Sequence, residues 1–178
     1  GWKEDFNLSF MDVVPAQLEA AEYIRDFAAF FPGLLRLGGH SKGGNLAVYS
    51  AMNCQPRIQD RIIRVYSMDG PGFRPEVMER CNYAMIADRV SKILPKSSLV
   101  GMIFEFDMSF QVVESKTIGL AQHDPYTWLV EDNHLKRAKG VYERRKRMGN
   151  ALNTWMLSLD EERLKIFVDT LYQVISAS

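Results

Sequence analysis

The sequence predicts an α/β fold in which a mainly parallel sheet is covered by helices on both faces. Short apolar segments alternate along the chain with longer segments of helical periodicity, a pattern typical of parallel sheets. The 178 residues are 47% hydrophobic and 25% charged, as expected for one soluble domain with a sizeable core. No repeat, low-complexity segment or linker divides the chain, so we expect a single domain over residues 1–178.

The first half of the chain gives clear local signals for strand and helix. Pro15 is a favourable first residue for a helix, and Pro32-Gly33 would end it. The residues expected on the inner face of this helix recur at three-to-four spacing: Leu18, Ala21, Ile24, Ala28 and Phe31. A buried strand at 34–37 should then run into Gly38-Gly39, and a helix suited to close packing should cover 45–52.

The second half continues the alternation and ends in helix. Residues 62–68 are rich in β-branched side chains and predict a strand that ends at the turn-forming Asp69-Gly70-Pro71-Gly72. A helical segment should follow from Pro75 to about Arg89, and then strands at 99–104 and 110–114, which a hairpin at Asp107-Met108-Ser109 could join. Asp124-Pro125 should start a helix, and a charged helix is expected from Glu131 to Arg147. A terminal helix should follow the capping box Ser158 to Glu161. The inner face of the terminal helix should carry Leu164, Phe167, Val168, Leu171 and Ile175.

The net charge and the composition of the chain bear on its expected partners and on its expected compartment. The 22 basic and 22 acidic residues cancel, so no global field attracts nucleic acid or an anionic membrane. Cys54 and Cys81 have neither metal-ligand spacing nor a disulfide framework, and no apolar run reaches the ~18 residues of a membrane span. We therefore expect a cytoplasmic protein. The basic run from Lys136 to Arg147 allows a peripheral membrane contact, although such a run on a helix usually serves solubility.

The motif with the clearest chemistry is Gly39-His40-Ser41-Lys42-Gly43. It lies between a predicted strand and a predicted helix, the setting of a nucleophile elbow, in which a sharp turn exposes a serine hydroxyl. The N-terminus of the following helix would direct the backbone N–H of Lys42 at the space beside Ser41, as an oxyanion donor. The alternatives are a glycine-rich turn with an inactive serine or a phosphate-binding loop, although the spacing of a nucleotide P-loop is absent.

A serine nucleophile needs a base, and three histidines compete for that role. His123 follows the last predicted strand and precedes a helix, where a catalytic histidine can reach the strand ends, so we favour it. His134 lies in a charged run whose simpler interpretation is a solvated helix face. His40 should point away from the Ser41 hydroxyl and is interpreted as a packing residue.

The base in turn needs a carboxylate, which in this arrangement follows the serine and precedes the histidine in the chain. Asp69 ends the strand after the nucleophile helix, at the edge of the sheet where active-site loops gather, and is favoured as the acid. Its other interpretation is a turn aspartate that caps Gly70-Pro71-Gly72. Asp88 and Asp107 are the alternatives, while Asp124 is expected to cap a helix.

Three segments together resemble lipase-like α/β hydrolases: 39–47, 69–73 and 122–125. The chain is most similar to a bacterial family of uncharacterised lipase-like proteins, the domain of unknown function 2974 group, from Gly1 through Trp128. Residues 67–73 also look like the acid-bearing loop of pancreatic-type lipases, which supports Asp69. The resemblance implies an α/β-hydrolase fold whose early strands and second oxyanion donor lie upstream of the segment matching Gly1 to Asp5, so we expect this chain to lack them.

These inferences predict a carboxylic-ester hydrolase that acts through an acyl-enzyme. Ser41 would attack, His123 would transfer the proton, Asp69 would orient His123, and the Lys42 N–H would bind the oxyanion. The substrate would be a small-molecule or lipid ester, and no metal or organic cofactor is implied. A thioesterase or a peptidase would use the same catalytic groups. The Lys42 side chain would either cover apolar surface or meet an anionic substrate group. The alternative function is a non-catalytic binding or scaffold protein that kept the hydrolase fold.

Overall fold

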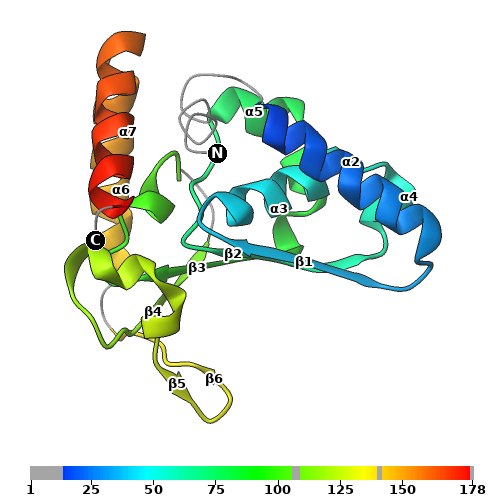
Figure 1. The fold of residues 1–178 in the computed structure, drawn as a ribbon, viewed down its shortest axis with the longest axis horizontal. Coiled ribbons are helices and arrows are strands. Elements are labelled where there is room, and N and C mark those ends of the chain that lie inside the picture. Colours follow the sequence, from blue (N-terminus) through cyan, green and yellow to red (C-terminus); the bar gives the residue numbers. More distant parts are fainter. Residues whose placement is uncertain (1–13, 106–108, 140–141, 177–178) are drawn as a thin grey trace.

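A four-stranded parallel sheet forms the centre of the computed structural model, which describes residues 14–105, 109–139 and 142–176 (Figure 1). Its strands, in spatial as well as chain order, are β1 (Leu35–His40), β2 (Ile62–Met68), β3 (Val90–Pro95) and β4 (Phe110–Val113). All three strand pairs are parallel. The predicted α/β fold with a mainly parallel sheet is therefore confirmed.

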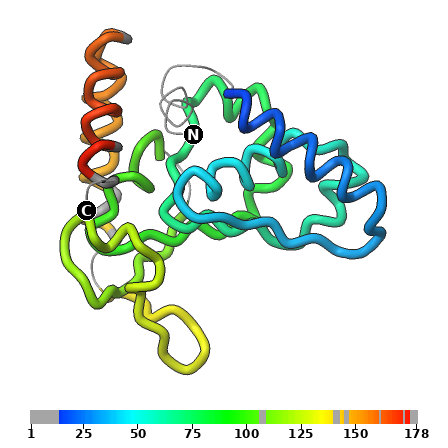
Figure 2. Tube along the Cα trace, viewed as in Figure 1, coloured from blue at the N-terminus to red at the C-terminus, as the bar shows by residue number. Residues whose placement is uncertain are grey.

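The α-helices of the described residues gather on one face of this sheet, whereas the sequence predicted helices on both faces. They are α2 (Pro15–Phe30), α3 (Lys42–Asn53), α4 (Pro56–Gln59), α5 (Pro75–Arg80), α6 (Tyr142–Leu157) and α7 (Glu161–Ser176). Figure 1 shows α2 to α5 on the same side of the strands, and α6 contributes Leu152 to the core over β3 and β4. Figure 2 shows α6 and α7 side by side, where Met156 packs with Leu164 and Val168.

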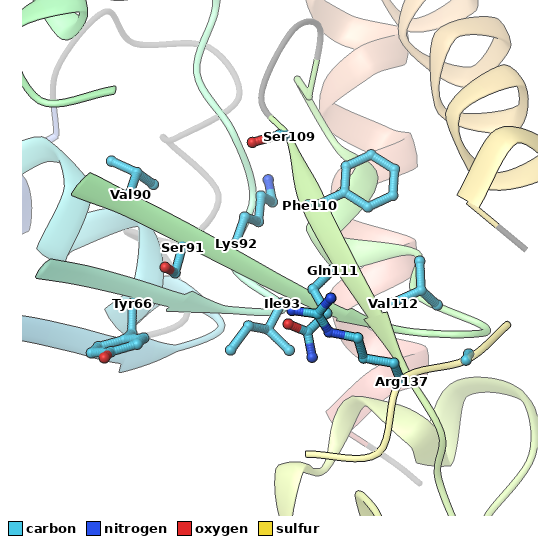
Figure 3. Close-up of a pocket in the computed structure, with 11 residues that line it drawn as sticks. Tyr66, Val90, Ser91, Lys92, Ile93, Ser109, Phe110, Gln111, Val112 and Arg137 are labelled. Carbon is cyan, nitrogen blue, oxygen red and sulfur yellow. The ribbon is translucent and has the colours of Figure 1, made fainter. Parts of the chain in front are cut away.

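The other face of the sheet carries polar and aromatic side chains. Arg36, Arg64 and Tyr66 are exposed there, in place of the continuous apolar runs of a strand covered on both sides. In Figure 3, Tyr66, Ile93 and Gln111 lie on this side of the strands with Arg137, and they help to line a groove of about 470 Å³. None of the residues that line this groove belongs to a described helix.

The buried face of helix α2 differs from the predicted face at both ends of the helix. Ala21, Ile24 and Ala28 pack against the core as predicted, but Leu18 is 58% exposed and Phe31 is 43% exposed. The buried residue of the first turn is Gln17, whose side-chain amide donates to Asn45 of α3 at 2.8 Å. Because successive helical residues are turned by about 100°, burial of Gln17 directs Leu18 away from the core.

The middle of the chain departs most from prediction. The third strand is β3, which the sequence did not indicate, and the strand predicted at 99–104 is replaced by a short 3₁₀ turn, η3 (Val100–Met102). Lys92 interrupts the apolar side of β3, so its alternation is hidden in the sequence. The helical segment from Pro75 ends at Arg80 and gives way to the 3₁₀ turns η1 (Tyr83–Met85) and η2 (Ala87–Arg89). Two residues of the hairpin suggested at 107–109 lie outside the described residues.

The charged segment predicted as a helix from Glu131 begins instead with a hairpin. Strands β5 (Val130–Glu131) and β6 (His134–Leu135) pair antiparallel, and α6 starts only at Tyr142. Asp132 and Asn133 form the turn with φ of 49° and 65°, the left-handed conformations that a tight hairpin requires. The terminal helix is confirmed, with Leu164, Val168 and Leu171 buried, although its cap is Asp160, which accepts from the N–H of Arg163 at 2.8 Å. None of the described helices is both long and apolar enough to cross a membrane.

A buried ion pair joins the sheet to the segment after η3. The Lys92 ammonium donates to the Glu105 carboxylate, and both side chains are only 2% exposed. Asn153 of α6 fixes the same segment, because its side-chain oxygen accepts from the N–H of Phe104 and its nitrogen donates to the carbonyl of Glu105, both at 2.8 Å. Charges buried this deeply stabilise a fold only while they remain paired.

We therefore expect Lys92→Met to lower the free energy of unfolding by about 3–5 kcal/mol, since the buried Glu105 would lose the ammonium of Lys92. The double variant Lys92→Met, Glu105→Leu should lose less than the single variant, because both charges of the pair are removed together. Urea unfolding of both variants measures this. A single variant within about 1 kcal/mol of wild type, or a double variant worse than the single, would contradict the assignment.

Candidate active site

Ser41 lies at a strained turn between β1, which ends at His40, and α3, which begins at Lys42. Its backbone has φ 54° and ψ −125°, a conformation that non-glycine residues rarely adopt. The turn is fixed from both sides, because the Ser41 N–H donates to the carbonyl of Met68 and the Ser41 carbonyl accepts from Gly44, each at 2.9 Å. This is the strand-turn-helix geometry of a nucleophile elbow.

The two glycines of the motif have different roles. A Cβ on Gly39 would lie 2.3 Å from the backbone carbon of Gly43, so the strand and the helix cross too closely for any side chain at Gly39. A Cβ on Gly43 would meet no described atom within 4 Å. Gly44 and Gly70 in turn both pack against the Ser67 hydroxyl, at distances that would exclude a Cβ.

The structure brings together Ser41, Asp69 and His123, which lie far apart in the chain. The His123 Nε2 atom is 3.0 Å from the Ser41 Oγ, and the His123 Nδ1 atom is 2.8 Å from the Asp69 Oδ2. Asp69 is 1% exposed, and His123 ends the 3₁₀ turn η4 (Gly119–His123) with a mostly buried side chain. The arrangement allows a proton to move from the serine to a histidine that a buried carboxylate orients. The catalytic roles of the three residues stay predictions.

Asp69 is held by groups that the sequence did not indicate. Its second oxygen, Oδ1, accepts from the Ser98 hydroxyl and from the Gly101 N–H, the latter at 3.2 Å. The Asp69 N–H donates to the carbonyl of Ile93 at 2.8 Å, and the Asp69 backbone has a positive φ of 48°. Ser98 precedes the η3 turn and Gly101 lies within it, where the sequence predicted a strand at 99–104. No sequence signal linked either residue to the acid.

The alternative residues lie elsewhere. Asp88 has an 83% exposed side chain and pairs with Arg89 on the surface. His134 is exposed on the β5–β6 hairpin, where its Nδ1 contacts the carbonyl of Asp132 at 2.8 Å. Asp107 lies outside the described residues. Asp124 caps the 3₁₀ turn η5 (Pro125–Thr127), since its carboxylate accepts from the Tyr126 N–H at 3.0 Å, which confirms the expected cap.

His40 contacts the backbone of the candidate base. Its Nε2 lies 2.7 Å from the carbonyl oxygen of His123, and the two ring centroids are 4.5 Å apart. Burial lowers the pKa of His40 below its usual value, and the neighbouring His123 lowers it further. His40 is therefore neutral at neutral pH. The interpretation of His40 as a packing residue did not include its polar contact with the His123 carbonyl.

Lys42 is the first residue of α3, directly after Ser41. Backbone N–H groups at the start of a helix can donate to an anion, and the role of the Lys42 N–H as an oxyanion donor stays a prediction. Within the described ranges, no group of three His, Cys, Asp or Glu side chains could hold a metal ion. Burial raises the pKa of the free Cys54 thiol to about 11, so this thiol is mostly protonated at neutral pH.

The crossing of β1 and α3 predicts opposite outcomes for two matched substitutions. Gly39→Ala should prevent stable folding or lower the free energy of unfolding by about 3 kcal/mol or more, because the new methyl group overlaps backbone. Gly43→Ala should be neutral or stabilising by up to about 1 kcal/mol, because alanine favours the helix. Thermal and urea unfolding of the pair test this, and equal losses would refute the crossing as described.

The sequence matches the family model described as Mbeg1-like over residues 1–173. The chain therefore belongs to the Mbeg1-like family, which is lipase-like and related to hydrolases. This finding corrects the family expected from the motifs, the domain of unknown function 2974 group of the α/β hydrolases. Short segments around a serine recur in many lipase-like proteins, so they were too little to assign the family. A comparison with curated proteins gave no match.

Proposed function

We propose that this member of the Mbeg1-like family is a serine hydrolase that cleaves a carboxylic ester through an acyl-enzyme on Ser41. The observation that carries the proposal is the unbroken hydrogen-bonded path from Asp69 through His123 to Ser41, with separations of 2.8 and 3.0 Å. A serine hydroxyl is a weak nucleophile without such a base. The lipase-like character of the family supports hydrolysis as the reaction class.

The same geometry gives each group one task. The Ser41 oxygen attacks the acyl carbon of the ester while its proton moves to the His123 Nε2, and Asp69 stabilises the imidazolium that forms. The oxyanion of the tetrahedral intermediate lies beside the Lys42 N–H. When the intermediate collapses, His123 gives the proton to the leaving alcohol and the acyl group stays on Ser41. Water then repeats the sequence, with His123 as base, and releases the carboxylic acid.

The positions of these residues in the sheet support an α/β-hydrolase fold in one domain over residues 1–178. Ser41 follows β1, Asp69 follows β2 and His123 follows β4, so all three lie beyond the carboxyl ends of parallel strands. They also occur in the order serine, acid, histidine that this fold uses. The proposed substrate is a small-molecule or lipid ester, and the chemistry needs no cofactor.

We expect Ser41→Ala to abolish hydrolysis of a short-chain p-nitrophenyl ester, with kcat reduced at least about 10³-fold and the unfolding temperature almost unchanged. Loss of the hydroxyl removes the nucleophile but no core contact. The measurement is ester turnover by wild type and variant at equal concentration. A variant that keeps near-native turnover would remove Ser41 from the mechanism, and an inactive wild type would favour a non-catalytic protein.

We expect Asp69→Asn to lower kcat about 10²- to 10⁴-fold, because the amide cannot hold His123 in the productive tautomer. Asp88→Asn is the matched control, since the same change on an exposed side chain should leave turnover within about twofold. Ester turnover with a thermal unfolding curve for each variant separates activity from stability. The opposite ranking would move the acid away from Asp69.

A further inference from the structure

We infer that His40, the residue before the nucleophile, is a positioning residue that holds the main chain of His123 and so fixes the base between Asp69 and Ser41. The inference rests on the proposed function, because it concerns the orientation of the proposed base. His40 ends β1, where it is in register with Met68 of β2. Its ring is therefore carried by the sheet, while His123 is carried by a turn beyond β4.

The donor and the acceptor of the hydrogen bond between the two histidines can be assigned. The His123 carbonyl can only accept, so the His40 Nε2, 2.7 Å away, must carry the hydrogen. This fixes the tautomer of a neutral His40 ring. The 4.5 Å separation of the ring centroids, with planes inclined by 45°, also limits how far the His123 ring can turn.

Three hydrogen bonds of Gln122, the neighbour of His123, also hold the turn that carries His123. The Gln122 side chain accepts from the Ser97 N–H at 2.8 Å and donates to the Thr117 carbonyl at 2.7 Å, while the Gln122 carbonyl accepts from the Trp128 indole at 2.8 Å. These bonds place the turn against the end of β3. The bond from His40 ties the His123 carbonyl to the strand that leads into Ser41, so it helps to set the distance between base and nucleophile.

The electrostatics of the pair agree with this role. His123 must become an imidazolium during each acyl transfer, and a second cation 4.5 Å away would oppose that step. The pKa of His40 is lowered by burial and by His123, so the His40 ring stays neutral while His123 takes up its proton. A neutral N–H donor therefore holds the base without competing for charge.

Two substitutions separate this role from simple packing. His40→Gln places an amide N–H near the position of the histidine Nε2 and removes the ring, whereas His40→Phe keeps an aromatic ring and removes the donor. Positioning by the hydrogen bond predicts that kcat falls about 10-fold or more in His40→Phe, at nearly unchanged KM, while His40→Gln stays within about threefold of wild type. His134→Phe, on the exposed hairpin, is the matched control and should have wild-type turnover.

The experiment measures kcat and KM on a short-chain p-nitrophenyl ester, the rate of labelling by a fluorophosphonate probe, and the unfolding temperature of each variant. A His40→Phe variant that is as stable and as active as wild type would overturn the inference, as would equal kcat losses in His40→Phe and His40→Gln. Wild-type protein that neither labels nor turns over ester would instead refute the proposed function. The two failures are therefore distinguishable.

Discussion

The close crossing of β1 and α3 at Gly39 is the constraint on which the candidate site depends. Because the backbone of Gly43 occupies the place of a side chain on Gly39, α3 can start directly above the end of the strand. The chain then has one residue in which to turn, and Ser41 takes up a positive φ to do so. This strain places the hydroxyl 3.0 Å from His123 and leaves the helix N-terminus beside it.

A second, buried layer of polar contacts holds the acid in place. The Lys92–Glu105 pair and the side chain of Asn153 fix the segment that follows η3, while Ser98 before η3 and Gly101 within it supply a hydroxyl and an N–H to Asp69. A helix distant from the nucleophile, α6, therefore supports the orientation of the carboxylate. Loss of these contacts is therefore expected to affect the stability of the fold and the orientation of Asp69 together.

The proximity of Ser41, Asp69 and His123 could be predicted because each residue has a signal in the local sequence. Ser41 is flanked by glycines between a predicted strand and a predicted helix, and Asp69 and His123 each come after a predicted strand. The supporting groups could not be predicted, since Ser98 and Gly101 reach Asp69 only through tertiary packing. Likewise, the charged residues between 131 and 137 fit a solvated helix as well as an exposed hairpin, and the turn at Asp132 and Asn133 decides between them. The uncovered face of the sheet also depends on which helices pack, which periodicity does not specify.

The central claim is that Ser41 is an activated nucleophile, and the most direct measurement is the mass of the chain after exposure to a fluorophosphonate. One phosphonyl group should add to the protein, and peptide mapping should place it on the Ser41 hydroxyl, because His123 activates that serine through its Nε2. Prior unfolding should abolish the reaction, since the unfolded chain cannot form the triad. An unmodified native chain, or an adduct on another serine, would contradict the account.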